Sequence, residues 1–393
     1  MVQFRTVCLS AHLDSFCRKL DELCGLEFVY ECADPGETRR RVGWSVDAAY
    51  RHGPITPENT ERAKTCELLY DMLREVDIFE ARAKRGLKTV YASERWLKPI
   101  SLFALRLFGH LILVRLPGVV RLLVPHYRKM TKRLAQLMED PNFFVFPIGV
   151  PAVRDMVRIY HVAKGDWRFF FHEPKVGIER KLGGSVRGFP RMRLWSYFVE
   201  RSKSGKTERR CPKVDEGGQK LLKILWVGRM LDWKRVDTLI KAFKIVARHR
   251  PAALLLVGEG PERHWLEKLA GASLEVQHST QTWIEGKIAF HNYVKSDEVR
   301  QLMRQASVYV MPSNAEEGWG AAVSDALSEG CPVLSTYEAG SSATLLPDKN
   351  LFTAGNVDEL ADLLSHFECK MVEYSPEAWG GIAAAEEIKE LVG

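Results

Sequence analysis

The chain has 393 residues, a formal net charge of +7 and 46% hydrophobic residues, so it is long and apolar enough for two globular domains. Its first twenty residues lack a basic start followed by a continuous apolar segment, and we therefore expect no signal peptide. Its eight cysteines include no C-x-x-C pair, which argues against a zinc site and indicates reduced thiols in the cytosol.

Short apolar strands alternate with helices through the first 200 residues. We expect strands at residues 2–9, 26–30, 76–79, 89–92, 143–147 and 167–171, and helices ending near residue 23, over 58–75 and from residue 152. Polar residues follow two of these strands: His12 and Asp14 after the first, and Glu94 and Arg95 after 89–92. Since ligands bind beyond the carboxyl ends of parallel strands, these four residues are candidates to contact a substrate. The alternatives are a helix cap at Asp14 and a surface ion pair between Glu94 and Arg95.

Residues 100–128 form a strongly apolar stretch that is interrupted by Arg106, Arg115, Arg121, Arg128 and Pro117. These residues argue against a transmembrane helix. Two interpretations remain: a basic segment that lies on a membrane surface, or two helices with an apolar core face and an arginine-bearing solvent face. Further on, residues 186–213 are basic and broken by glycine and proline, which is typical of an interdomain linker.

The second half of the chain begins with a strand at residues 221–227, which Gly228 and Arg229 follow directly. Lys234 precedes a helix expected at 236–248. An arginine at a strand end can fork across phosphate oxygens, and a lysine adds a point charge, so this segment fits a phosphate group. Later strands are expected at 253–257 and 287–290, and Asn292 and Tyr293 lie in the turn after the second of these.

Residues 307–335 predict one parallel β-α-β unit: a buried strand at 308–311, a loop, a helix at 321–328 and a second strand from about 332. The N-terminus of that helix suits an anion, commonly phosphate. Glu317 in the loop and Asp325 in the helix could flank the same ligand, and carboxylates accept hydrogen bonds from hydroxyl groups. The predicted ligand has a phosphate centre and hydroxyl-rich ends, which describes a nucleotide sugar.

Two segments, SNAEEGWGAAVSDALSEGCPV and VGRMLDWKRVDTLIKAF, resemble the retaining GT-B glycosyltransferases of family 4, glycosyl transferases group 1, of the bacterial polysaccharide type. The resemblance implies an α/β GT-B fold with two Rossmann-like domains whose parallel sheets face a central cleft. It implies an acceptor-binding domain at 1–200, a basic linker at 201–218, a nucleotide-sugar-binding domain at 219–368, and a final helix within 369–393 that crosses back to the first domain.

The resemblance also assigns roles to residues. Glu317 contacts hydroxyls of the donor sugar, and Asp325 stands where the family has a glutamate that contacts the ribose. Arg229 and Lys234 clamp the diphosphate, and together with Glu317 they form the predicted catalytic set. Asn292 stands where the family usually has a glycine in the turn whose backbone pairs with the base. The full predicted donor site consists of Gly228, Arg229, Lys234, Asn292, Tyr293, Glu317, Gly318, Trp319, Gly320 and Asp325.

The expected function is retaining transfer of a sugar from a UDP-sugar or GDP-sugar to a glycan or lipid-linked acceptor. No D-x-D motif occurs in the sequence, so we expect neither a metal ion nor a cofactor. The sequence shows no nucleic-acid recognition motif, which leaves the phosphate donor and an anionic membrane as partners for the basic surface. We expect a cytoplasmic location, with a peripheral position on the inner face of the cell membrane as a variant. The alternatives are a catalytically silent GT-B scaffold protein and a GT-B nucleotide-sugar epimerase.

Overall fold

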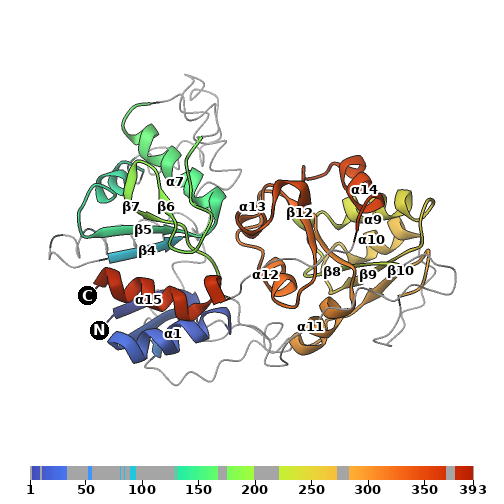
Figure 1. The fold of residues 1–393 in the computed structure, drawn as a ribbon, viewed down its shortest axis with the longest axis horizontal. Coiled ribbons are helices and arrows are strands. Elements are labelled where there is room, and N and C mark those ends of the chain that lie inside the picture. The colour runs from blue at the N-terminus through green and yellow to red at the C-terminus, as the bar shows by residue number, and fades with distance from the viewer. Residues whose placement is uncertain are drawn as a thin grey trace. The chain divides into compact units, whose positions relative to one another are not determined.

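The computed structural model describes residues 2–8, 11–32, 52–54, 80, 84, 89–93, 129, 131–166, 175–198, 221–271, 283–368 and 377–392. The chain divides into two compact units (Figure 1). Unit 1 consists of residues 1–34, 46–198 and 381–393, and unit 2 consists of residues 35–45 and 199–380. The last change of unit is at residue 381, where the chain returns from unit 2 to unit 1.

The described strands of unit 1 form two sheets. The first is parallel, in the order β1-β2-β3, and is built from β1 (Val2–Cys8), β2 (Leu26–Cys32) and β3 (His52–Pro54). The second has the order β4-β5-β7-β6, with β4 (Thr89–Ser93), β5 (Phe143–Pro147), β6 (Ser185–Val186) and β7 (Phe189–Arg193). Only β6 runs antiparallel to its neighbour.

Aromatic rings hold the core of unit 1 together. The ring of Trp195 lies 4.8 Å from that of Phe146, 5.4 Å from that of Phe198 and 6.2 Å from that of Phe16. These residues come from β5, from α1 (Ala11–Cys24) and from the segment after β7, so the cluster joins parts of the chain that are far apart in sequence. Helix α7 (Val150–Ala163), which follows β5, buries most of its apolar residues in the same unit.

Helix α15 (Gly381–Val392) packs against α1 in unit 1, and the two helices lie side by side in Figure 1. Gly381 allows this close approach, because a Cβ atom there would lie 2.3 Å from Oγ of Ser15 and 2.5 Å from the backbone nitrogen of Phe16. A side chain at position 381 would therefore push the two helices apart.

The sequence-based interpretation of residues 186–213 as linker was wrong for its first part. Residues 185–193 form the hairpin of β6 and β7, and Trp195 belongs to the core of unit 1. The glycine and proline that suggested a linker belong to this hairpin: Gly188 has a φ of +84° in its turn, and Pro190 lies in β7. The expected linker at 201–218, the helix at 58–75, the stretch at 100–128 and the strand at 167–171 lie outside the described residues.

The described strands of unit 2 form one six-stranded parallel sheet in the order β10-β9-β8-β11-β12-β13. Its strands are β8 (Leu222–Val227), β9 (Ala252–Val257), β10 (Ile288–His291), β11 (Val308–Met311), β12 (Val333–Thr336) and β13 (Leu351–Phe352). Numbered within the unit, this is the order 3-2-1-4-5-6 of a Rossmann fold. All six residues of β9 are buried, as is typical of a central parallel strand that is covered on both faces.

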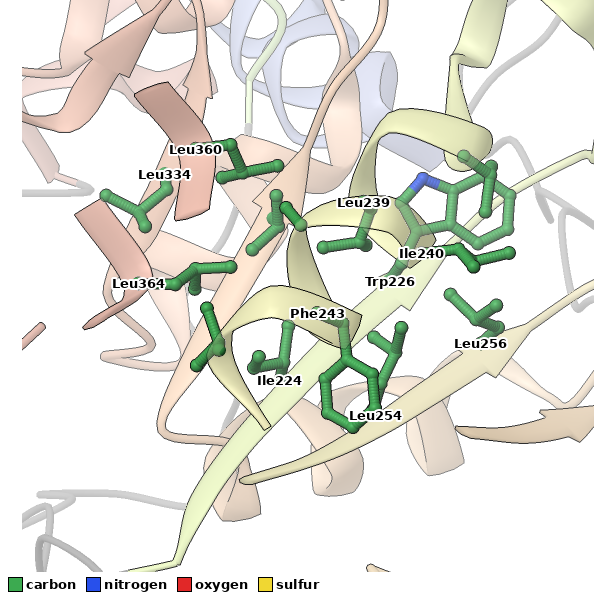
Figure 2. Close-up of a cluster of buried hydrophobic side chains, with 14 of the residues drawn as sticks. Ile224, Trp226, Leu239, Ile240, Phe243, Leu254, Leu256, Leu334, Leu360 and Leu364 are labelled. Carbon is green, nitrogen blue, oxygen red and sulfur yellow. The ribbon is translucent and has the colours of Figure 1, made fainter. Parts of the chain in front are cut away.

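Two hydrophobic clusters cover the two faces of this sheet. Residues of α9 (Val236–Val246) and α14 (Val357–Ser365) pack with Ile224, Trp226, Leu254 and Leu256 on one face, as Figure 2 shows. The apolar residues of α9 recur at the spacing of one helical face, which explains why this segment forms an amphipathic helix. Residues of α11 (Ser296–Gln305) and α12 (Ala321–Ser328) cover the other face. Ala339, which directly precedes α13 (Gly340–Leu345), packs with them.

The expected strand at 308–311 and helix at 321–328 have the same bounds as β11 and α12. Helix α9 ends two residues before the predicted limit of 248, and α10 (Arg263–Ala270) fills the region after β9. None of the helices in the described part of the chain is both long enough and apolar enough to span a bilayer.

Candidate active site

The candidate site lies where the strand order of unit 2 reverses. Strands β8 and β11 are neighbours in the sheet, but the chain leaves them toward opposite sides: β9 pairs on the far side of β8, and β12 on the far side of β11. In open parallel sheets, ligands bind in the crevice at the carboxyl ends of two such strands. Gly228 and Arg229 follow β8, and the loop with Glu317 follows β11.

Lys234 and Glu317 meet at this point in an ion pair between the ammonium and the Oε2 atom. The two side chains are 18% and 9% exposed, so the pair is largely shielded from water. Trp233 supports the lysine from another side, because the ammonium lies 4.2 Å from the centroid of the indole ring. The sequence-based analysis predicted both charged residues but neither their pairing nor the role of the tryptophan beside them.

Backbone hydrogen bonds fix the two segments that carry this pair. Trp233 lies in the 3₁₀ turn η3 (Asp232–Lys234), and its carbonyl accepts a hydrogen bond from the backbone nitrogen of Asn314 at 2.9 Å. The carbonyl of Asn314 in turn accepts from the backbone nitrogen of Glu317 at 3.0 Å. The ion pair is therefore built on a connected backbone frame, and it does not depend only on two flexible side chains.

The Gly318-Trp319-Gly320 tripeptide forms the floor and end of the loop. Trp319 is 1% exposed, and its indole nitrogen donates to Oγ of Ser324 at 3.0 Å, inside α12. Gly320 has a φ of +81° and directly precedes α12, and a Cβ atom there would lie 2.7 Å from Cε of Met311. Glycine thus allows the sharp entry into the helix whose N-terminus faces the strand ends.

Arg229 lies next to the turn after β10. Its charge acts on Tyr293: burial raises the pKa of the Tyr293 phenol, and the positive charge of Arg229 opposes this change. The Tyr293 hydroxyl donates to the carbonyl of Glu259 at 3.2 Å, and the backbone nitrogen of Met230 donates to the same carbonyl at 2.8 Å. The segments after β8, β9 and β10 are therefore tied together around Arg229.

Arg263 of α10 holds the predicted base-binding turn in place. Its Nη1 atom donates to the carbonyl of Gly258 at 3.0 Å, to the carbonyl of His291 at 3.2 Å and to Oδ1 of Asn292 at 2.9 Å. Asn292 replaces the glycine of the family pattern, yet Arg235 alone among the described non-glycine residues has a positive φ. Asn292 therefore has a negative φ, although a glycine at this position could also adopt the left-handed conformation.

Asp325 lies about one turn into α12, on the helix that follows the Glu317 loop. Its Oδ1 atom is buried and has no hydrogen-bond partner, and it lies 3.8 Å from Nη2 of Arg300. Tyr309 of β11 feels the charge of both acids: burial raises the pKa of its phenol, and the negative charges of Glu317 and Asp325 raise it further. The Tyr309 hydroxyl donates to the carbonyl of Val227, the last residue of β8, at 3.3 Å. The charges of the two predicted acids thus both act on one buried hydroxyl at the strand ends.

The predicted acceptor residues belong to unit 1. His12 and Asp14 lie in the first turn of α1, and Asp14 forms an ion pair with Arg18 at 2.7 Å. Glu94 and Arg95 lie outside the described residues. The part of the chain described here contains no group of three or more His, Cys, Asp or Glu side chains that could hold a metal ion.

Sequence reasoning did not identify Trp233 and Tyr309 as residues of the site. It also missed Arg300 and the buried Glu329 that Arg300 binds. A signal was present for the charged ones: Arg300 and Arg304 are four residues apart in the sequence, and so are Asp325 and Glu329. Residues at this spacing share a helix face, so two pairs of opposite charge indicate helices that meet.

Comparison with known proteins finds similarity to glycosyltransferases in the same region of the chain, residues 222–367. The model of the family described as Glycosyl transferases group 1 matches residues 222–367, which is the described core of unit 2. An uncharacterized glycosyltransferase of Methanocaldococcus jannaschii is 35% identical over 118 residues, which are 30% of this chain and 27% of that protein. The phosphatidylinositol N-acetylglucosaminyltransferase gpi3 subunit of Schizosaccharomyces pombe is 26% identical over 155 residues, or 39% of this chain and 32% of that protein.

The two aligned segments thus span less than a third of the length of these curated relatives. A similarity over the whole chain comes from solved structures. The crystal structure of the Anabaena protein Alr3699/HepE in complex with UDP aligns with all of this chain and 96% of that chain, at 13% identity and a TM-score of 0.54. The parallel α/β units described above and this similarity show that the chain has the fold of the GT-B glycosyltransferases.

Proposed function

We propose that the protein transfers a sugar from a nucleoside diphosphate sugar to a glycan or lipid-linked acceptor, with retention of the anomeric configuration and without a metal ion. The observation that carries this proposal is the buried Lys234–Glu317 pair at the strand-order reversal of unit 2. It places a cation for phosphate and a carboxylate for hydroxyls side by side, inside the segment that the glycosyltransferase family model matches.

The proposed donor pose follows from the charges. Arg229 and Lys234 bind the diphosphate, together with the N-terminus of α12 after Gly320. These groups stabilise the negative charge that develops on the leaving diphosphate, and they need little rearrangement because the surrounding backbone is fixed. Glu317 accepts hydrogen bonds from the donor sugar, and Asp325 accepts them from the ribose. The donor phosphate receives the proton of the acceptor hydroxyl, so no protein nucleophile is required.

The donor rearranges one existing contact when it binds. In the free protein, Glu317 and Lys234 neutralise each other. A sugar hydroxyl and a phosphate oxygen supply new partners for the two side chains, so that each trades part of the ion pair for the ligand. The ion pair therefore holds both side chains in place before the donor arrives.

The acceptor and the location of the enzyme belong to the proposal as well. Unit 1 would hold the acceptor, and the basic apolar stretch at 100–128 would rest on an anionic membrane on the cytoplasmic side. The name of the fission yeast relative includes phosphatidylinositol, which supports a lipid-linked acceptor. Co-sedimentation with anionic vesicles that weakens as salt rises tests this location, and no binding at low salt contradicts it.

The test of the activity compares two neighbouring acids. The wild-type protein is incubated with a panel of UDP-sugars and GDP-sugars, and release of UDP or GDP is measured. Glu317→Gln should abolish most of this release but leave the affinity for the free nucleotide nearly unchanged, because the free nucleotide lacks the sugar. Glu316→Gln is the matched control, since Glu316 is the adjacent acid and its side chain is exposed.

The possible results separate the proposal from its rivals. Nucleotide binding without any donor turnover would favour a silent scaffold protein, and a changed sugar in the recovered donor would identify an epimerase. Equal loss of turnover and nucleotide binding in Glu317→Gln would mean that Glu317 supports the structure of the loop. The Anabaena neighbour was solved with UDP, and UDP is therefore the first nucleotide to titrate.

A further inference from the structure

Helices α11 and α12 meet through four charged side chains, which we call the α11–α12 charge cluster: Arg300, Arg304, Asp325 and Glu329. The Nη1 atom of Arg300 donates to Oε1 of Glu329 at 2.9 Å. Arg304 donates from Nη1 to Oε2 of the same carboxylate. Glu329 is only 2% exposed, so it is a buried acid held by two arginines.

Of the two arginines, Arg300 is the one that also faces Asp325. Its Nη2 atom lies 3.8 Å from Oδ1 of Asp325, within the range of an ion pair but beyond that of a hydrogen bond. A guanidinium group is planar and rigid, so the bond from Nη1 to the buried Glu329 also determines where Nη2 lies. The positive charge thus attracts the carboxylate of Asp325 without occupying its hydrogen-bond acceptor sites.

The burial and hydrogen bonding of the Asp325 carboxylate agree with this arrangement. An ionised carboxylate accepts hydrogen bonds at about four lone-pair positions. The Oδ1 atom is buried without a hydrogen-bond partner, whereas the side chain as a whole remains 23% exposed. Because Oδ1 is buried beside Arg300, the acceptor positions that a ligand can reach lie on the part of the carboxylate that remains exposed. The two hydroxyl groups of a ribose are donors of the matching kind.

We propose that Arg300 is a positioning residue for ribose recognition, and that it fixes the carboxylate of Asp325 toward the two ribose hydroxyls of the donor. This inference rests on the proposed function, which places the nucleoside at Asp325. An aspartate is one methylene shorter than a glutamate, and its reach therefore depends more strongly on where its carboxylate is held. Arg300 supplies that restraint from the neighbouring helix.

The chain offers a matched pair of variants for the test. Arg300→Gln and Arg304→Gln each remove one ion pair to Glu329, but only Arg300 faces Asp325. Both full-length variants and the wild type are titrated by calorimetry with UDP and with 2′,3′-dideoxy-UDP, which lacks the two ribose hydroxyls. If GDP is the nucleotide that binds, the guanosine pair replaces the uridine pair.

We expect Arg300→Gln to weaken UDP binding about tenfold, which equals about 1.4 kcal/mol, and to leave binding of the dideoxy nucleotide within about twofold. Arg304→Gln should leave both affinities within about twofold. In an Asp325→Ala background, Arg300→Gln should have no further effect, because a residue that acts through Asp325 has nothing left to position. Arg300→Lys keeps the charge but cannot span both acids, and it should give a smaller, ribose-specific loss. This variant also serves if Arg300→Gln does not fold.

Three results would overturn the inference. Equal losses in Arg300→Gln and Arg304→Gln would mean that the cluster only holds the two helices together. Equal losses for UDP and the dideoxy nucleotide would mean that Arg300 acts on the diphosphate or on the fold. Additive losses in the Asp325→Ala background would mean that Arg300 does not act through Asp325. If the wild type binds neither UDP nor GDP, the proposed function itself fails, and the inference falls with it.

Discussion

Different kinds of interaction hold the two units together. In unit 2, the segments after β8, β9, β10 and β11 are connected by backbone hydrogen bonds around one sheet edge, above two largely aliphatic clusters. In unit 1, an aromatic cluster of Phe16, Phe146, Trp195 and Phe198 joins segments that are distant in sequence. Consequently, a binding site in unit 2 can be changed with little effect on its frame, whereas unit 1 depends on a few large side chains.

The strongest test of this contrast removes the centre of the aromatic cluster. Trp195 is 4% exposed, and Trp195→Ala should destabilise unit 1 by about 3–5 kcal/mol, the usual loss for a buried aromatic residue. Urea denaturation with and without UDP measures this effect. We expect one transition to move to lower urea while the transition that UDP stabilises stays in place.

Trp265→Ala is the control for this experiment, because Trp265 is 48% exposed on α10 and its removal should change stability little. A single transition that shifts as a whole in Trp195→Ala would show that the two units unfold together. In that case the two units would share their stability, and the contrast would not hold.

The second test changes a side chain at the sheet edge of unit 2. Arg229→Ala should weaken nucleoside diphosphate binding by about 1.5–3 kcal/mol, the range for a charged hydrogen bond. Stability should hardly change, because Arg229 is exposed and the backbone around it is fixed by other groups. Calorimetry with UDP and GDP measures the affinity, and Arg248→Ala, an exposed arginine after α9, is the control. Unchanged affinity in Arg229→Ala would remove this residue from the donor site.

Trp233 provides a finer test of the same edge. Trp233→Leu removes the ring beside the Lys234 ammonium but keeps the backbone carbonyl that binds Asn314. We expect a loss of about 0.5–2 kcal/mol in diphosphate binding, the range for a cation–π contact. Trp233→Phe should restore part of it, and Trp265→Leu should have no effect. Equal losses for UDP and uridine would show that the ring does not act through the lysine and the phosphates.

The smallest expected effect concerns Arg235, which has a φ of +50° just before α9. A glycine adopts this conformation without strain, so Arg235→Gly should be more stable than Arg235→Ala by about 1 kcal/mol. Both variants lose the same contact to Asp237, which Lys241 also binds, so the comparison isolates the backbone. Thermal unfolding measures the difference. Equal stability of the two variants would show that the backbone relaxes at this position.

The sequence predicted the elements of unit 2 well, since each strand there is a short apolar run that ends at a glycine or polar loop. The strand at 308–311 and the helix at 321–328 were predicted to the residue, and they carry the loop of Glu317 and the helix of Asp325. The prediction was weaker in unit 1, where the hairpin of β6 and β7 was interpreted as linker. Its glycine and proline follow the same pattern as a flexible segment, and only its pairing with β5 reveals the strand.

Contacts between segments that are distant in the chain could not be predicted from the sequence. Lys234 and Glu317 are 83 positions apart, and nothing in their local patterns predicts that they pair. The same holds for Arg300 and Asp325, which meet only because α11 and α12 pack side by side. Pattern analysis thus predicts which residues carry charge at strand ends, but the three-dimensional arrangement decides which charges neutralise each other and which remain available.

The packing of α15 against α1 has a consequence for the order in which the two units fold during translation. Gly381 contacts Ser15 and Phe16, so the start of α1 has its helical partner more than 360 positions later in the chain. The contiguous sequence of unit 2 between residues 199 and 380 is synthesised before that partner exists. We therefore expect unit 2 to fold during translation, while the side of α1 that packs against α15 stays uncovered until residues 381–392 emerge, and a chaperone can bind this side in that period.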